Sequence, residues 1–187
     1  AQLSDSLKRM YAPDKRVALF DVDYSFAGKN VMLRGVTTSA EAKAALLQGL
    51  AKVDYKVMDC IQVLPDVKGL EGKTYGIINV SVANLRAAPD FSSEMMTQGL
   101  MGMPVHVLQR DGWIHIQPHD NFIAWDQRVG VHLVNEAEMA AWNNAEKIVV
   151  TAHYGFVYSK PDRTSQTISD VVAGNRFKCD GSYGAFY

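Results

Sequence analysis

The chain has little cysteine, no excess of charge and no long apolar run, and each of these features excludes a class of protein. Cys60 and Cys179, the only cysteines in 187 residues, are too few and too far apart for a disulfide framework or a CxxC metal site. Lys and Arg number 19 against 20 Asp and Glu, a net charge of −1, so no basic stretch is present to release counterions from a nucleic acid. No apolar run approaches the roughly 18 residues that span a bilayer. We therefore expect neither a nucleic-acid partner nor a membrane span.

The sequence also lacks a pair of residues placed for catalysis or metal binding. A catalytic thiolate needs a histidine within hydrogen-bond reach. Cys60 lies in an alternating stretch without a nearby histidine. Cys179 is expected in the middle of a strand, followed by Asp180-Gly181, and not at the head of a helix. The five histidines show none of the i, i+4 pairing of a helical zinc site. We assign no catalytic residue, no metal ligand and no cofactor, and the residues leave open whether the chain is an enzyme.

What the chain does contain is a series of short strands over residues 76–127. Alternation of apolar and polar residues begins at Val80 and is interrupted at Pro89. Asp111-Gly112 is the strongest hairpin signal, because a tight turn needs a positive φ that glycine adopts without steric cost. The spacing predicts a small β-barrel.

Two tryptophans of this stretch are expected in the barrel core. Trp113 follows the hairpin turn and alternates with the polar His115, so we expect it to face inward, and we expect the same of Trp125.

The residues before this stretch predict a small β-β-α-β module. Thr38 and Glu41 have the spacing of a capping box, in which each side chain satisfies a free backbone N–H of the first helical turn. The expected elements are a helix over 4–11, strands over 16–26 and 31–36, a helix after residue 38 and a strand over 56–64.

One segment of this module is similar to the first motif of haloacid-dehalogenase-type phosphatases. Asp21 and Asp23 stand where those enzymes have a nucleophile and a general acid. Tyr24 replaces the glycine at which the chain turns, and no magnesium site follows. We interpret both aspartates as outward residues of an alternating strand.

The chain after residue 146 repeats the barrel at a constant offset of 72 residues. Leu85, Pro89 and Gly102 correspond to Val157, Pro161 and Gly174. The repeat stops before counterparts of the closing strands, so we expect an incomplete second barrel and a chain that is a fragment.

The predicted fold class is therefore α+β, a small β-β-α-β module followed by two mainly-β barrels. We predict four segments, which are the α/β module at 1–66, the first barrel at 67–134, a linking helix at 135–145 and the truncated second barrel at 146–187.

The first barrel resembles the bacterial Src-homology-3-like module of cell-wall enzymes. The resemblance depends on an Asn-Leu-Arg then proline, a glycine before a valine strand, an Asp-Gly-Trp turn, and an aromatic residue shortly before a second tryptophan. The matching residues are Asn84, Leu85, Arg86, Pro89, Gly102, Asp111, Gly112, Trp113, Phe122 and Trp125. Ala124 departs from the pattern, since the family has glycine there.

The order of modules resembles the non-catalytic front part of periplasmic NlpC-type cysteine peptidases, of the dipeptidyl-peptidase VI kind. The resemblance implies recognition of the peptidoglycan stem peptide L-Ala-γ-D-Glu-diaminopimelate, with a papain-like catalytic domain that follows the second module and is missing from this chain. It also implies an acidic and an aromatic residue at the free amine of L-alanine, for which Glu94 and Phe122 are the candidates.

Two further functions remain open at this point. The chain could be a stand-alone pair of modules that binds peptidoglycan or a protein, or a purely structural spacer.

The first residue bears on where the protein is found. The sequence begins at Ala1 without an initiator methionine, as in an exported protein cut after a small residue. We therefore expect a periplasmic or cell-envelope location.

Overall fold

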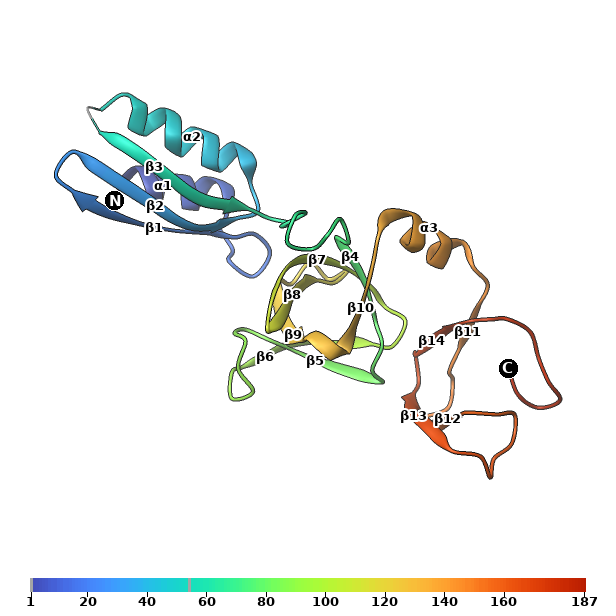
Figure 1. Ribbon diagram of the computed structural model, residues 1–187. Helices are drawn as coiled ribbons and strands as arrows, with labels where there is room; N and C mark the ends of the chain where they lie inside the picture. Colours follow the sequence, from blue (N-terminus) through green and yellow to red (C-terminus); the bar gives the residue numbers. More distant parts are fainter. Residues whose placement is uncertain (1, 54) are drawn as a thin grey trace. The chain divides into compact units, whose positions relative to one another are not determined.

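The computed structural model describes residues 2–53 and 55–187, and its contacts divide the chain into two compact units (Figure 1). One unit extends to residue 69 and the other begins at residue 70. Among the helices of the described residues, none combines the length and the apolar character needed to cross a membrane.

The first unit is a three-stranded sheet with two helices. Strands β1 and β2 form an antiparallel hairpin that turns at Gly28, where φ is +60°. Strand β3 returns through α2 to lie parallel to β2, in the order β1-β2-β3. The β-β-α-β order predicted from the sequence is present, with a helix before it. The elements are α1 (Gln2–Tyr11), β1 (Phe20–Ala27), β2 (Asn30–Thr37), α2 (Ala40–Ala51) and β3 (Lys56–Val63).

The core of the first unit lies between the helices and the sheet. Leu7 of α1 and Leu46 of α2 pack with Val31, Leu33 and Ile61 from the strands, and all five side chains are at most 7% exposed. Removal of these apolar side chains from water stabilises the unit and holds both helices against the sheet.

Two details of the first unit bear on the sequence predictions. The N-cap of α2 is Ser39, whose Oγ accepts a hydrogen bond from the N–H of Ala42 at 3.0 Å. The predicted cap, Thr38, is wrong because its hydroxyl instead accepts the N–H of Leu19. Asp21 and Asp23 are exposed on β1, as the strand interpretation requires.

The second unit begins with a seven-stranded sheet that curves around its own core (Figure 1). The strands follow one another in the order β10-β4-β7-β8-β9-β5-β6. They are β4 (Tyr75–Ile78), β5 (Val82–Arg86), β6 (Met95–Leu100), β7 (Pro104–Asp111), β8 (Trp113–Gln117), β9 (Ala124–Gln127) and β10 (Val131–Val134), with the 3-10 helix η1 (Arg128–Gly130) between β9 and β10.

This sheet is barrel-like but is not closed by strand pairing. Among the described residues, β6 and β10 are its two edges. The predicted small β-barrel is therefore present as an open, curved sheet. Ile78 lies next to the opening and is held by the turn after β6, since Gly102 donates its N–H to the Ile78 carbonyl at 2.8 Å and Ile78 donates to Met103 at 3.0 Å.

The core of the sheet is aliphatic. Its most buried members include Leu85, Val107, Ile114 and Ile116, each 0% exposed. These side chains occupy alternate positions of their strands, and their burial explains the hydrophobic alternation of the sequence.

Neither Trp113 nor Trp125 belongs to this core, and the core prediction for both is corrected. Both side chains are half-buried. Their neighbours Ile114 and Ala124 point inward instead, because a one-residue change of register reverses the face of a strand. Trp125 stacks on His115, which is buried, so the polar member of the predicted alternation lies beneath an aromatic ring.

The repeat predicted at an offset of 72 residues is present in the backbone. The pairing of Gly76 with Val105 recurs as Ile148 with Phe177. The hairpin β5-β6 recurs as β12-β13 with a bulge at the equivalent position. Between the two copies lies α3 (Glu136–Asn144), the predicted linking helix, which begins with a capping box between Asn135 and Glu138. The strands of the second copy are β11 (Lys147–Val149), β12 (Tyr154–Tyr158), β13 (Thr167–Val172) and β14 (Arg176–Lys178).

Equivalent turns use the same conformation. Gly102 and Gly174 follow β6 and β13 with φ of +82° and +93°, values that disfavour any residue with a Cβ. Within the described residues the second copy consists of two two-stranded sheets, β11-β14 and β12-β13.

The two copies are joined by polar contacts of one buried side chain. Asn175 is 0% exposed, its Nδ2 donates to the Ser81 carbonyl at 2.9 Å, and its Oδ1 accepts the Val172 N–H at 2.9 Å. The N–H of Arg176 donates to the Met101 carbonyl at 2.9 Å. These bonds attach the second copy to Ser81, just before β5, and to the turn after β6.

Candidate functional site

Glu94 lies at the end of the β5-β6 loop, immediately before β6. Its side chain is exposed. Its backbone is fixed, because the Glu94 carbonyl accepts the N–H of Ala87 at 2.9 Å across the loop. A carboxylate in this position is available to a ligand, and the same geometry also suits a solvated loop residue.

Phe122 lies in the β8-β9 loop and is half-buried. Its N–H donates to Oδ1 of Asp120 at 3.1 Å. The other oxygen of Asp120 accepts the hydroxyl of Thr97, in β6, at 2.9 Å. Because Thr97 is three residues after Glu94, the fold ties the two predicted contact residues to the same end of the sheet.

A pocket of about 200 Å³ opens on the second unit at a different place, between β5 and the end of β9. The sequence did not predict it. Strand β9 pairs with β8 from Ala124 to Gln127, but with β5 only through Arg86 and Trp125. The two strands therefore diverge beyond this pair, and the pocket lies between them. It is lined by Val80, Val82, Ala83, Asn84, Arg86, Phe91, Trp113, Asp126, Gln127, Val129 and Gly130.

One wall of the pocket is aromatic. Phe91, at the tip of the β5-β6 loop, meets the ring of Trp113 edge-on, with ring centroids 4.9 Å apart and planes inclined by 60°. Phe91 is nevertheless 64% exposed. The contact positions the loop over the start of β8 and leaves ring surface open to a ligand.

The polar residue of greatest interest in the pocket is Asp126. It is 5% exposed. Its Oδ1 accepts the N–H of Gln127 at 2.7 Å, and its Oδ2 has no hydrogen-bond partner among the described residues. Burial raises the pKa of the Asp126 carboxyl above its usual range, and the bond from Gln127 opposes the shift. Sequence reasoning missed Asp126. The signal that could have found it is a single carboxylate two residues after the apolar, inward-facing Ala124.

Neither cysteine is among the residues that line this pocket. Cys60 is exposed in β3 of the first unit, and Cys179 is partly exposed just after β14. The described residues contain no cluster of three or more His, Cys, Asp or Glu suited to a metal ion.

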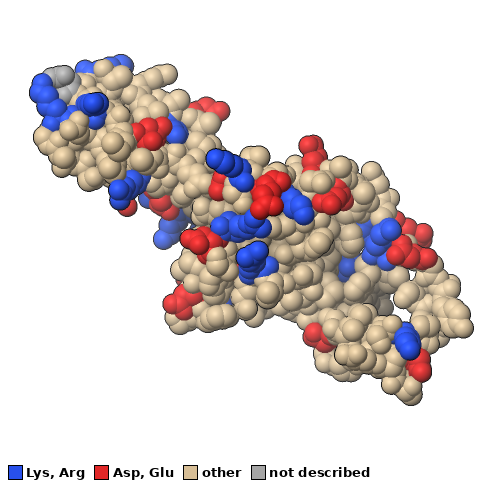
Figure 2. Space-filling model, in the orientation of Figure 1, with Lys and Arg blue, Asp and Glu red and all other residues tan. Residues whose placement is uncertain are grey.

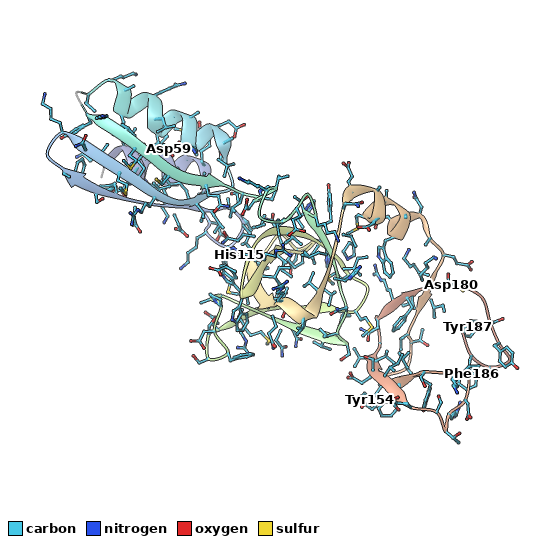
Figure 3. The ribbon with its side chains drawn as sticks, viewed as in Figure 1. Asp59, His115, Tyr154, Asp180, Phe186 and Tyr187 are labelled. Atoms are coloured by element: carbon cyan, nitrogen blue, oxygen red, sulfur yellow. The ribbon has the colours of Figure 1, made fainter. Side chains whose placement is uncertain are left out.

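Basic and acidic side chains are interspersed on the face shown in Figure 2. Figure 3 shows His115 within the curved sheet and Tyr154, Phe186 and Tyr187 in the C-terminal part. Tyr154 is 59% exposed and Tyr187 is 84% exposed.

The sequence of the first copy matches a family profile described as the bacterial dipeptidyl-peptidase Sh3 domain, over residues 85–125. Residues 85–125 are therefore similar to this Sh3 domain. The predicted resemblance to the non-catalytic region of dipeptidyl-peptidase-VI-like proteins is thereby confirmed for this segment. The Sh3 domain contains Glu94, Phe122, Trp113 and Trp125.

Known relatives extend the similarity beyond the Sh3 domain. The chain is 27% identical over 101 residues to Dipeptidyl-peptidase 6 of Lysinibacillus sphaericus, which covers 53% of this chain and 37% of that protein. The chain therefore spans little more than a third of the length of this curated relative.

Two solved structures are also similar. The first is an NlpC/P60 endopeptidase from Photobacterium damselae subsp. piscicida, with 15% identity, a TM-score of 0.47, and coverage of 62% of this chain and 28% of the other. The second is an NlpC/P60 family protein from Bacillus cereus, with 18% identity, a TM-score of 0.47, and coverage of 58% and 48%.

Proposed function

We propose that this chain is the substrate-recognition and targeting region of an exported cell-wall peptidase. The enzyme would cleave the γ-D-glutamyl bond before a diamino acid in peptidoglycan stem peptides, and a papain-like domain outside this chain would supply catalysis. The observation that carries the proposal is the Sh3 domain of the dipeptidyl-peptidase kind at residues 85–125. The periplasm or cell envelope, where the substrate is found, is the proposed location.

Glu94 and Phe122 give this proposal a chemical basis. The stem peptide begins with a free L-alanine amine, which is an ammonium group at neutral pH. An ammonium buried in a groove without a partner is costly, so an opposing carboxylate selects peptides with a free amino terminus. Glu94 is exposed and its backbone is held, and Phe122 belongs to the loop tied to the same strand. We assign the carboxylate that contacts the amine to Glu94 and the aromatic residue beside it to Phe122.

Binding of L-Ala-γ-D-Glu-diaminopimelate to the purified chain tests the proposal directly. The free peptide is titrated into the chain by isothermal calorimetry beside its N-acetylated form. We expect the free amine to bind more tightly, and the Glu94→Gln variant to lose that preference. A charged hydrogen bond contributes about 1.5–3 kcal/mol, or roughly a 10- to 100-fold preference.

Glu136→Gln, an exposed glutamate in the first turn of α3, is the matched control and should leave the preference intact. Equal affinity of the two peptides would contradict the assignment of Glu94. Absence of binding by both would contradict stem-peptide recognition and favour the alternative of a module pair that binds another cell-wall component or a protein.

A further inference from the structure

The pocket between β5 and β9 is separate from the proposed amine contact. Neither Glu94 nor Phe122 lines it. Two diverging strands border it, because β5 and β9 pair only at Arg86 and Trp125. Beyond that pair, no strand among the described residues pairs with the facing sides of β5 and β9, and unpaired strand backbone binds extended peptides through main-chain hydrogen bonds, with side chains held in adjoining pockets. An extended peptide is thus the ligand that suits the shape of this opening.

The aromatic wall defines what kind of side chain the pocket accepts. Trp113 is half-buried and Phe91 is 64% exposed, and their edge-on contact holds both rings at the pocket. Aromatic ring surface packs favourably against a flexible aliphatic chain, and ring faces attract a cation. A long aliphatic side chain that ends in an ammonium group satisfies both conditions.

Asp126 supplies the anion for such a group. It lines the pocket with a carboxylate that is 95% buried, and its Oδ2 has no partner among the described residues. A buried carboxylate oxygen without a donor is rare in folded proteins, since it loses its hydrogen bonds to water. An N–H group of a ligand would replace the hydrogen bond to water that the buried Oδ2 has lost.

Gly130 controls access to this oxygen. A Cβ at position 130 would lie 2.5 Å from Oδ2 of Asp126, so the carboxylate fits only because residue 130 has no side chain. Gly130 ends η1, a single turn whose middle residue, Val129, is 76% exposed. The Gly130 carbonyl accepts the N–H of Asn79 at 3.0 Å, which holds this turn beside the carboxylate.

Arg86 is the cation among the residues that line the pocket, and it is engaged elsewhere. Its Nη1 donates to the Ser93 carbonyl at 2.7 Å. Its charge also lies near Asp90, where it contributes to a lowered pKa of that carboxyl, although the bonds from Ser92 contribute more. The charge of Arg86 is thus partly balanced within the β5-β6 loop, and Asp126 remains for a cationic ligand.

We infer that this pocket binds an extended peptide segment whose amine-bearing side chain lies along Trp113 and Phe91 and donates an N–H to Asp126. The inference rests on the proposed function and deepens it, because it assigns the diamino acid of the stem peptide to the pocket. Glu94 and Asp126 then recognise two different amines of one ligand.

The test compares L-Ala-γ-D-Glu-L-Lys with the same peptide carrying norleucine, which has the aliphatic chain without the ammonium group. Each is titrated into the ¹⁵N-labelled 187-residue chain, and the indole N–H signals are followed by NMR. We expect the lysine peptide to shift the Trp113 indole, and the norleucine peptide to bind about tenfold more weakly. Trp142, outside the pocket, serves as the internal control.

Two variants separate the pocket from the amine contact. Asp126→Asn keeps the shape and the acceptor for Gln127 and should abolish the preference for lysine. Gly130→Ala places a methyl group against Oδ2 and should have the same effect. Glu94→Gln should weaken binding of the lysine and norleucine peptides equally and leave the preference for lysine intact. A melting curve on each variant verifies that it is folded.

Equal binding of the two peptides, or a lysine preference that survives Asp126→Asn, would overturn the inference. Such a result would leave the proposed function in place if the free amine of L-alanine still binds more tightly than its acetylated form. Conversely, loss of the amine preference with a retained lysine preference would contradict the role of Glu94 and support the pocket.

Discussion

His115 and Trp125 stack face to face, with ring centroids 4.0 Å apart and planes inclined by 4°. The two residues are direct partners across β8 and β9. Trp125 is also the residue through which β9 pairs with β5, opposite Arg86. The stack thus lies where three strands meet, and it covers a buried imidazole with an indole ring.

The stack should contribute a measurable coupling energy. We expect a double-mutant cycle of His115→Ala and Trp125→Ala to give about 0.5–1.5 kcal/mol, the range for aromatic pairs beyond burial of area. Urea unfolding followed by fluorescence measures it, because Trp113 and Trp142 report on the same unit. A coupling of zero would show that the two rings contribute independently.

Asp126→Asn should stabilise the protein near neutral pH, since an unpartnered carboxylate must otherwise be ionised in a buried place. Burial raises the pKa of Asp126 above its ordinary value of 3.8. The stability contributed by the protonated carboxyl is fully present below pH 3.8 and is lost as the pH rises through the raised pKa. We therefore expect a gain of about 1 kcal/mol at pH 7 that disappears near pH 3.

Thermal melting of both proteins between pH 3 and pH 7 measures this difference. Asp111→Asn, at the exposed end of β7, is the control. A variant that is less stable than the parent at pH 7 would mean that the Asp126 carboxylate has a stabilising partner.

Asn175→Ala should weaken the attachment of the second copy to the first. The change leaves the N–H of Val172 and the carbonyl of Ser81 without the amide group that now binds both. We expect a loss of about 1–3 kcal/mol. Asn143→Ala, at an exposed position of α3, should have little effect on the unfolding curve. Equal effects of the two changes would contradict this role of Asn175.

The second copy should exchange its backbone amides faster than the first. Its strands form two-stranded sheets, which are marginal without further strands to cover them. Hydrogen exchange by NMR compares Val157 with its equivalent Leu85, which is fully buried. The Arg176 amide should be an exception, because it donates to the carbonyl of Met101. Uniform protection of both copies would contradict the expectation.

The chain by itself should hydrolyse no peptide bond. Cys60 is in a strand of the first unit and Cys179 follows β14, and neither occupies the start of a helix beside a histidine. Incubation with L-Ala-γ-D-Glu-diaminopimelate followed by mass spectrometry measures any release of L-Ala-γ-D-Glu. Product that vanishes on Cys60→Ser or Cys179→Ser would contradict this prediction.

Local patterns in the sequence determined the order of elements, the hairpin at Gly112, the linking helix after residue 135 and the 72-residue repeat. These features depend on residues close in the chain, or on spacing that both copies share, so the amino acids alone specify them. The helix cap at Ser39 was missed because Thr38 has an equally suitable side chain, and its hydroxyl is taken by Leu19 from another segment.

Only the tertiary structure decided which face each tryptophan occupies and where a pocket opens. The register of β8 and β9 turns Ile114 inward and leaves Trp113 half-exposed, and a shift of one residue would reverse both. The pocket exists because β5 and β9 separate after a single pair. The buried position of Asp126 Oδ2 likewise depends on Gly130, four residues later, because a side chain at position 130 would occupy the same space. Burial and divergence of strands depend on how distant segments pack, and no local pattern encodes them.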